Sequence, residues 1–380
     1  MQGSEPSRSM AAFRREARRW LKAHVPGSAP PEDGPASREY VLEWQRTQAR
    51  GGWAGIAWPK EFGGRGLSVL EQIVWFEEYA RAGAPSPLNA SFVGLNHAGP
   101  TLIACGTPEQ KAFHLPRILA GDVLWCQGFS EPGAGSDLAS LRTRGRVEGT
   151  ELVIDGHKIW SSFADVADWQ ELLIRTDPEA RTSAALSWVI CPMNAAGITV
   201  RPIRTMAGPR KYCEVFYDAV RVPLSNVVGG LNNGWATAMS TLGFERGTAS
   251  LALLIGLILK VEQLLGACPP ERAELRMRLA RLRAEGASIR AMTYRFALDS
   301  DNAVPDASGS IIRLCFAEFT QRVTAAAIEL YGIDAPAVIG MHGWGHDYLD
   351  AFSETIAGGA AEIQRNIIAE RVLGLPKGPR

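Results

Sequence analysis

The densest group of residues that could do chemistry lies at positions 125–138, in the stretch WCQGFSEPGAGSDL. Its glycines and small hydroxyl residues would let backbone N–H groups come close to a bound ligand. The stretch lacks the Gly-Lys-Ser/Thr ending of a P-loop, and its spacing and surroundings do not match a Rossmann fingerprint. From these residues alone, a cofactor-binding loop and a glycine-rich turn between domains are equally good interpretations.

A second group occupies positions 155–163, with the sequence DGHKIWSSF. We expect a turn at Asp155-Gly156, followed by a strand that carries Trp160 and the hydroxyls of Ser161 and Ser162. An indole beside a hydroxyl donor can cover the face of a flat heterocycle and bond to its edge. Taken alone, a tryptophan in the core of a sheet is the simpler interpretation.

The elements around these motifs fall into three segments. Residues 11–122 have apolar side chains at helical spacing, separated by joints rich in proline and glycine. From about 123 to 228, short strand-like runs end at Gly, Pro, Asn or Asp, which suggests an antiparallel sheet or small barrel. Long helical patterns return at 235–258, 273–296, 311–331 and 360–373 and predict an antiparallel bundle. We therefore expect an α+β fold, mainly α, with domains at 1–122, 123–228 and 229–380.

The composition excludes several classes of function. Lys and Arg number 40, as do Asp and Glu, so no net charge attracts the protein to nucleic acid or anionic lipid. The longest apolar run, 251–259, is shorter than the roughly 20 residues of a membrane span. The six cysteines form no C-x-x-C pair and no zinc-site spacing, so we expect a reduced, cytoplasmic protein without a bound metal.

Together, the two motifs resemble signatures of the acyl-CoA dehydrogenase family. The first is similar to (T/S)-E-P-x-x-G-S-D and the second to K-x-W-(I/T)-(T/S). Four further family patterns follow the same order along the chain: W-P-x-x-(F/Y)-G-G-x-G at 58–66, G-(T/S)-x-x-Q-K at 106–111, V-P-x-x-N at 222–226 and (E/Q)-I-Q-R-x-I-I-A at 362–369. The resemblance covers nearly the whole chain. It implies a helical N-terminal domain, a middle β-domain and a C-terminal four-helix bundle, with FAD between the last two.

The resemblance also implies the residues of the site. Those expected at the cofactor are Gln127, Phe129, Ser130, Gly135, Ser136, Trp160, Ser161 and Ser162. Among them, Ser130 would bond the pyrimidine edge of the flavin, Trp160 would cover the ring, and Ser162 would bond near N5, the atom that receives hydride. Those expected at the substrate are Ser136, Leu242, Phe244, Arg246 and Ala357. The small Ala357 would leave room for a bulky or branched acyl group.

The family's reaction needs a carboxylate base, and its place in this sequence is unusual. Most members carry the base in an E-G-(T/S) segment before the last helix, but alignment puts Gly358 there. A minority carry it on the first helix of the bundle, where this sequence has Glu245. We therefore expect Glu245 to take the α proton and the N–H of Gly358 to bond the thioester oxygen. The alternative is that Glu245 is an acid in the first turn of a helix, favoured by the helix dipole.

Homotetrameric members reach a neighbour's FAD through two segments, R-x-x-F-G and Q-x-x-G-G. In this chain the first is missing at 265–272, and the second is degenerate at 329–333. In this respect the chain resembles the catalytic chain of α2β2 acyl-CoA dehydrogenases of steroid side-chain breakdown. The resemblance implies an acyl-CoA substrate, an electron-transfer flavoprotein as acceptor and a homologous partner subunit, for which the arginine-rich helix 271–295 is a candidate interface. Two alternatives remain: dehydrogenation of an acyl group tethered to a carrier protein, and a non-catalytic subunit that stabilises an active relative.

Overall fold

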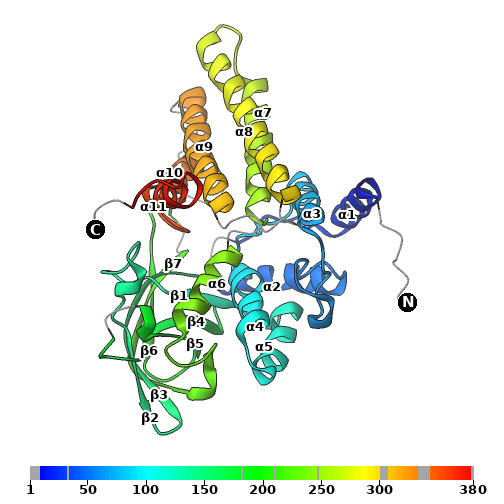
Figure 1. Ribbon diagram of the computed structural model, residues 1–380. Coiled ribbons are helices and arrows are strands. Elements are labelled where there is room, and N and C mark those ends of the chain that lie inside the picture. The colour runs from blue at the N-terminus through cyan, green and yellow to red at the C-terminus, as the bar shows by residue number, and fades with distance from the viewer. Residues whose placement is uncertain are drawn as a thin grey trace.

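The computed structural model describes residues 9–31, 34–180, 183–208, 211–245, 248–299, 307–332 and 343–377. Figure 1 shows a group of long helices standing above a β-sheet and a set of shorter N-terminal helices. The order of elements is therefore helices, then sheet, then helices, and the expected α+β, mainly α, fold class is confirmed.

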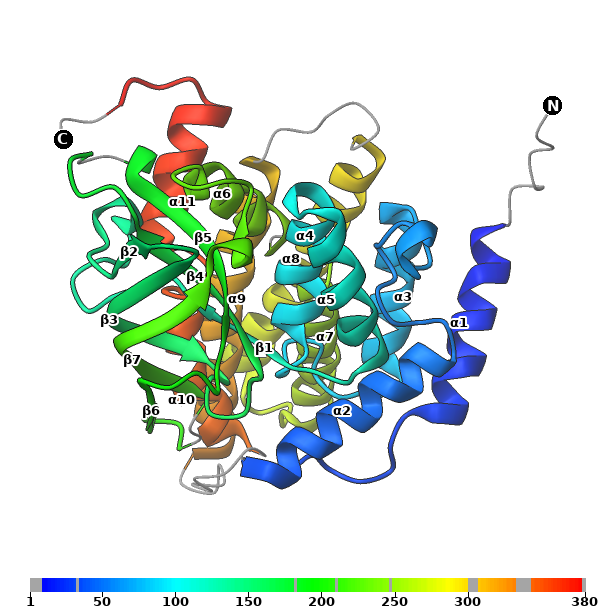
Figure 2. The same cartoon turned by 90° about the horizontal axis from the view of Figure 1, so that it is seen from below.

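The N-terminal segment forms short helices. They are α1 (Met10–His24), α2 (Gly34–Arg50), α3 (Val69–Arg81), the π-helical turn η2 (Gly94–Ala98), α4 (Gly99–Cys105) and α5 (Pro108–Ala120). Capping boxes fix where two of them begin, because Ser68 and Glu71 pair at the start of α3, and Thr107 and Gln110 at the start of α5. In Figure 2, α1 and α3 lie on the side opposite the sheet, and α4 and α5 lie nearer to the sheet.

The middle segment forms one eight-stranded sheet. Its strands are β1 (Trp125–Gly128), β2 (Arg144–Glu148), β3 (Glu151–Ser162), β4 (Trp169–Arg175), β5 (Leu186–Pro192), β6 (Ile198–Ile203), β7 (Tyr212–Pro223) and β8 (Val227–Val228). The order is β6-β7-β3-β2-β4-β5-β8, and β1 pairs with β4. Buried side chains of β3 and β7 pack against those of β4 and β5, so the sheet curls around its own apolar core.

The turn expected at Asp155-Gly156 is wrong, because β3 runs through it as one strand. The ladder between β3 and β7 shifts register between Ile154 and Gly156, which is a β-bulge. The Asp155 carboxylate accepts the N–H of Ala219 at 2.9 Å and satisfies the backbone at this irregularity. A Cβ at Gly156 would lie 2.4 Å from Thr143 Oγ1, so the close packing of the bulge requires glycine.

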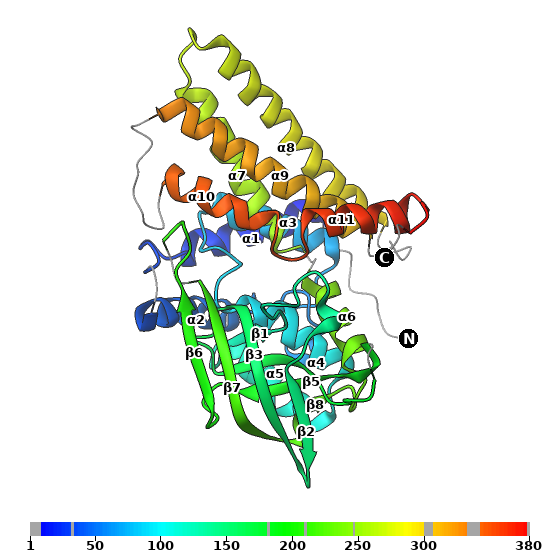
Figure 3. The ribbon, with the colours of Figure 1, turned by 90° about the vertical axis from the view of Figure 1, so that its left-hand side faces the viewer.

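The C-terminal segment contains α6 (Gly234–Glu245), α7 (Ser250–Ala267), α8 (Ala273–Asp299), α9 (Ala307–Tyr331), α10 (Trp344–Glu354) and α11 (Ala361–Ile367), which continues as the π-helical turn η8 (Ile368–Val372). The single helix predicted at 235–258 is wrong: α6 and α7 are separate helices. The reason is that α6 packs on the sheet and on α4, where Thr241 bonds Thr101 at 2.9 Å. In Figures 1 and 3, α10 and α11 lie between the long helices and the sheet.

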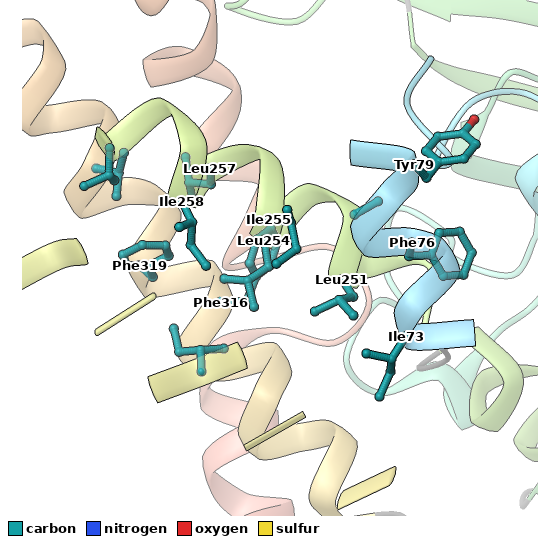
Figure 4. Packing of buried hydrophobic residues seen from close by; sticks show 14 of the residues in the cluster. Ile73, Phe76, Tyr79, Leu251, Leu254, Ile255, Leu257, Ile258, Phe316 and Phe319 are labelled. Carbon is teal, nitrogen blue, oxygen red and sulfur yellow. The ribbon is translucent and has the colours of Figure 1, made fainter. Parts of the chain in front are cut away.

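The largest core joins the bundle to the N-terminal helices. Figure 4 shows Leu251, Leu254 and Ile258 of α7 between Ile73 of α3 and Phe319 of α9. By length and composition alone, α7 could cross a bilayer, but many of its apolar side chains are buried in this core, as in the central helix of a globular bundle.

Candidate active site

Hydrogen bonds join the two motifs that the sequence singled out. The N–H of Ile159 on β3 donates to the carbonyl of Ser130 at 2.9 Å. The ammonium of Lys158, one residue earlier, donates to the carbonyl of Phe129 and to Glu131, each at 2.9 Å. The glycine-rich stretch and the strand that carries Trp160 therefore form one surface.

A buried ion pair holds this surface together. Lys158 is fully buried, and burial lowers the pKa of its ammonium to about 8 although Glu131 opposes this effect. Burial alone would raise the pKa of Glu131, but Lys158 and the N–H groups of Arg142 and Thr143 outweigh it and hold the pKa below its ordinary value. Glu131 is thus a structural carboxylate, tied by three donors and unsuited to proton abstraction.

Several features of this surface fit a flat cofactor with polar edges. The indole of Trp160 is 56% exposed, and its backbone has a φ of 62°, a left-handed conformation that costs a non-glycine residue about 1 kcal/mol or more. The Ser161 hydroxyl is buried without a hydrogen-bond partner among the described residues. A Cβ added to Gly133 or Gly135 would meet nothing within 4 Å, so packing within the chain does not account for these glycines. The exposed ring and the open glycine loop suit the ring and polar edge of FAD, whereas the Ser161 hydroxyl is closed off from solvent and its role toward the cofactor stays a prediction.

The other predicted cofactor residues lie in different surroundings. The ring of Phe129 is 4% exposed and packs in the apolar cluster with Trp58 and Trp125, so a role of its side chain toward the flavin stays a prediction. Ser130 and Ser162 are half-buried and Ser136 is exposed, which leaves their hydroxyls accessible.

Gly358 lies in the turn between α10 and α11, with a φ of 64° that favours glycine. Arg313 of α9 donates to the Ala357 carbonyl at 2.9 Å and to the Glu354 carboxylate at 2.6 Å. Because the peptide is planar and trans, this bond makes the Gly358 N–H point away from Arg313. That N–H donates to no acceptor among the described residues, whereas the Gly358 carbonyl accepts from Gln364 at 3.1 Å. Within the described part of the chain, the turn thus offers an oriented donor whose acceptor is not a protein group.

The turn lies close to the strand that carries Trp160. Lys211, next to Tyr212 on β7, is close enough to α10 for Asp350 and Glu354 to act on it. Burial lowers the pKa of Lys211, but Tyr212 and these two carboxylates outweigh burial and raise it. The edge of the Tyr212 ring in turn contacts Trp160, at 5.9 Å between ring centroids. Lys211 therefore links α10 electrostatically to β7, whose Tyr212 contacts Trp160.

The substrate residues expected on α6 lie at its end. Leu242 is half-buried and Phe244 is exposed. Glu245 is the last residue of α6; its side chain and all of Arg246 lie outside the described residues. The alternative interpretation of Glu245 as a first-turn acid is wrong, because Glu245 is the last residue of α6 and α7 begins only at Ser250.

A cavity of about 70 Å³ adjoins the segment that follows Glu245. Its lining includes Thr248, Ala249 and the aromatic rings of Trp53, Trp75 and Tyr79. It is an apolar space at the interface between the N-terminal helices and α7. A larger hollow of about 460 Å³, between α9 and α10, contains none of the predicted site residues.

The arginine-rich helix α8 bonds largely within its own chain. Arg278 and Arg272 pair with Glu329 of α9, Arg283 pairs with Glu262 of α7, and Arg290 pairs with the buried Glu77 of α3. These pairs account for three of its arginines, and for Arg272 just before the helix, without a partner subunit. They also neutralise Glu329 in the region that corresponds to the degenerate Q-x-x-G-G segment.

Sequence reasoning missed three residues that support the site. Lys158 is the lysine of the K-x-W motif, but the motif does not show that it pairs with Glu131, and Arg313 lies in no motif and acts through a contact distant in sequence. Glu171 of β4 is a fully buried carboxylate beside Gln127. The signal for Glu171 was present, because a charged residue interrupts the otherwise apolar centre of β4.

Comparison with known proteins identifies the family. Models of the acyl-CoA dehydrogenase N-terminal, middle and C-terminal domains match residues 7–122, 126–220 and 232–373. Acyl-CoA dehydrogenase IpdE1 of Mycobacterium tuberculosis is 38% identical and covers 96% of this chain and 97% of its own length. The Tcur3481–Tcur3483 steroid ACAD structure has a TM-score of 0.85 at 33% identity, covering 100% of both chains. The ChsE4–ChsE5 complex from Mycobacterium tuberculosis has a TM-score of 0.81 at 31% identity, again over 100% of both chains. The chain therefore belongs to the acyl-CoA dehydrogenase family of FAD-dependent oxidoreductases.

Proposed function

We propose that this protein is the catalytic chain of a heteromeric acyl-CoA dehydrogenase that removes the α and β hydrogens of a bulky acyl-CoA thioester. The observation that carries the proposal is the combination of two features. The β-domain presents an exposed indole and open glycine loop that suit FAD, and the turn at Gly358 presents an N–H with no acceptor among the described residues.

In this mechanism the residues have separate tasks. Glu245 takes the α proton, while the Gly358 N–H bonds the thioester oxygen on which negative charge develops. FAD, when bound, accepts the hydride that leaves the β carbon. Residues Gln127, Ser130, Trp160, Ser161 and Ser162 hold the cofactor, and Gly135 and Ser136 approach both cofactor and substrate.

A partner subunit is part of the proposal. The chain lacks the segments through which related homotetramers complete a neighbour's FAD site, and two similar solved structures are complexes of two different chains. Apolar side chains at the C-terminal end, Val372, Leu373 and Leu375, are each about half exposed or more. We propose a homologous partner, a steroid-type acyl group and an electron-transfer flavoprotein as acceptor.

The test is co-purification with a homologous partner, followed by dye reduction with acyl-CoAs of increasing bulk. Glu245→Gln should retain FAD yet lower the rate by about 10²–10⁴, the contribution of a positioned base. Glu262→Gln, which removes an exposed charge on α7, is the matched control. A near-normal rate in the Glu245 variant would refute the assignment of the base, and an FAD-saturated assembly of this chain alone would refute the partner.

A further inference from the structure

A buried carboxylate next to the cofactor surface has no role in the mechanism above. Glu171 lies on β4, fully buried, opposite Gln127 of β1 in the parallel ladder. Burying a carboxylate costs several kcal/mol unless donors compensate for its lost hydration. Two donors converge on its Oε1 atom: Gln127 Nε2 at 2.8 Å and His97 Nδ1 at 3.1 Å.

The chemistry of the carboxylate fixes the orientation of both partners. A carboxyl oxygen with two nitrogens at hydrogen-bond distance acts as the acceptor of both, so Gln127 directs its NH₂ group, and His97 its Nδ1–H, toward Glu171 Oε1. The amide oxygen of Gln127 is then turned away from Glu171. That oxygen has no hydrogen-bond partner among the described residues, and the Gln127 side chain is half-buried.

The backbone that carries His97 is also unusual. His97 lies in the π-helical turn η2, and such turns are frequent at functional sites. The edge of the Phe92 ring packs against the imidazole at 5.0 Å between centroids. The next helix starts at Gly99, where a Cβ would lie 2.0 Å from Trp58 Cζ2, so glycine lets this turn pack tightly. The imidazole of His97 is therefore held by the Phe92 ring on one side and by the Glu171 carboxylate on another.

We propose that Glu171 and His97 are positioning residues that lock the Gln127 amide, so that its carbonyl oxygen accepts the N–H of the flavin pyrimidine ring. This inference rests on the FAD site of the proposed function. The reacting part of an acyl thioester carries no N–H or O–H, whereas the oxidised isoalloxazine ring carries one N–H between two carbonyls. An oriented acceptor matches that N–H, and a flipped amide would place a donor against it.

The test compares FAD with 3-methyl-FAD, in which a methyl group replaces this N–H. The co-purified complex is stripped of flavin, and the Kd of each flavin is measured by fluorescence and visible absorption. The wild-type complex should prefer FAD by at least about fivefold, which is about 1 kcal/mol for one hydrogen bond. Glu171→Gln keeps the volume but lets the Gln127 amide flip, so the preference should fall below about twofold.

Gln127→Ala is the second variant, because its half-buried side chain can be removed with less risk to folding, and it should also abolish the preference. Gln45→Leu is the control, since Gln45 is a buried amide outside the cofactor surface that bonds the carbonyls of Ile118 and Leu119. Unchanged preference in both site variants, or equal binding of the two flavins by the wild type, would overturn the inference. Turnover is not measured, so failure of dehydrogenation and failure of this device are separate results.

Discussion

Replacing Arg313 with Met tests whether the Gly358 N–H is held in place for catalysis. The guanidinium donates to the Ala357 carbonyl at 2.9 Å and, at 2.6 Å, to both the carboxylate and the carbonyl of Glu354. The side chains of Arg313 and Glu354 are each 20% exposed, so screening reduces the value of this charged pair. We expect a loss of about 2 kcal/mol of unfolding free energy, at the low end for bonds to charged groups.

The effect on turnover should be larger than the loss of stability explains. Removing a donor to a developing oxyanion outright costs about 10²–10³ in kcat. Arg313 acts one step away, by fixing the peptide plane between Ala357 and Gly358, so we expect kcat of Arg313→Met to fall about 10- to 30-fold. KM should change little, because the bond to the thioester oxygen strengthens in the transition state.

The assay measures kcat and KM of the co-purified complex. It also records the absorption of a bound, unreactive aromatic thioester, whose band moves to longer wavelength when its carbonyl is polarised. Arg322→Met is the control, since Arg322 lies on the same helix and pairs with Glu285 at the surface. If Arg313→Met lowered stability but left kcat and the spectral shift at wild-type values, the reasoning about the peptide plane would be wrong.

Three further outcomes are expected. Lys158→Met should lower the unfolding free energy by about 3–5 kcal/mol, because it leaves a buried carboxylate without its charge partner; urea denaturation measures this, with the exposed Lys60→Met as control. Burial raises the pKa values of Glu77 and Glu78, but hydrogen bonds from arginines outweigh burial and lower both pKa values below the ordinary 4.5. The two carboxylates therefore stabilise the fold above pH 4.5, and this stability is lost as the pH falls through their lower folded pKa values. A urea midpoint that stayed constant from pH 6 to 3 would contradict this. Trp160→Ala should change the unfolding free energy of the flavin-free chain by less than about 1 kcal/mol, since the indole is largely exposed, yet weaken FAD binding several-fold in a fluorescence titration.

The fold could be predicted wherever local pattern and burial agree. Strand-like runs bounded by turn residues at 171–174, 185–191 and 198–203 predict strands, and β4, β5 and β6 lie there. The break between α6 and α7 could not, because an unbroken helical pattern does not show that one half packs on the sheet and the other in the bundle. Asp155-Gly156 has the composition of a turn, but pairing with β7 turns it into a bulge.

The motifs of the site could be predicted from the sequence, but the long-range contacts that hold them in place could not. The glycine loop and the Trp160 strand have distinctive local sequences, so resemblance placed them in the same site, and the Ser130–Ile159 hydrogen bond joins them. Lys158 belongs to the K-x-W motif, but its partner Glu131 is 27 positions away, and Arg313 belongs to no motif and bonds a carbonyl 44 positions away. Long-range electrostatic contacts of this kind depend on the completed tertiary structure and leave no period or spacing to detect.

The backbone at position 358 also gives a physical reason for a relocated base. Glycine adopts a φ of 64° without strain, whereas glutamate does not. At the next residue, Gly359, a Cβ would lie 2.4 Å from Gln364 Nε2. This turn can therefore supply an N–H donor at low cost but is poorly built to carry a carboxylate. The residue proposed as the base, Glu245, belongs to a different element, since it is the last residue of α6. In the proposed mechanism the donor and the base are therefore on separate elements, and the turn at Gly358 keeps a backbone conformation that suits glycine.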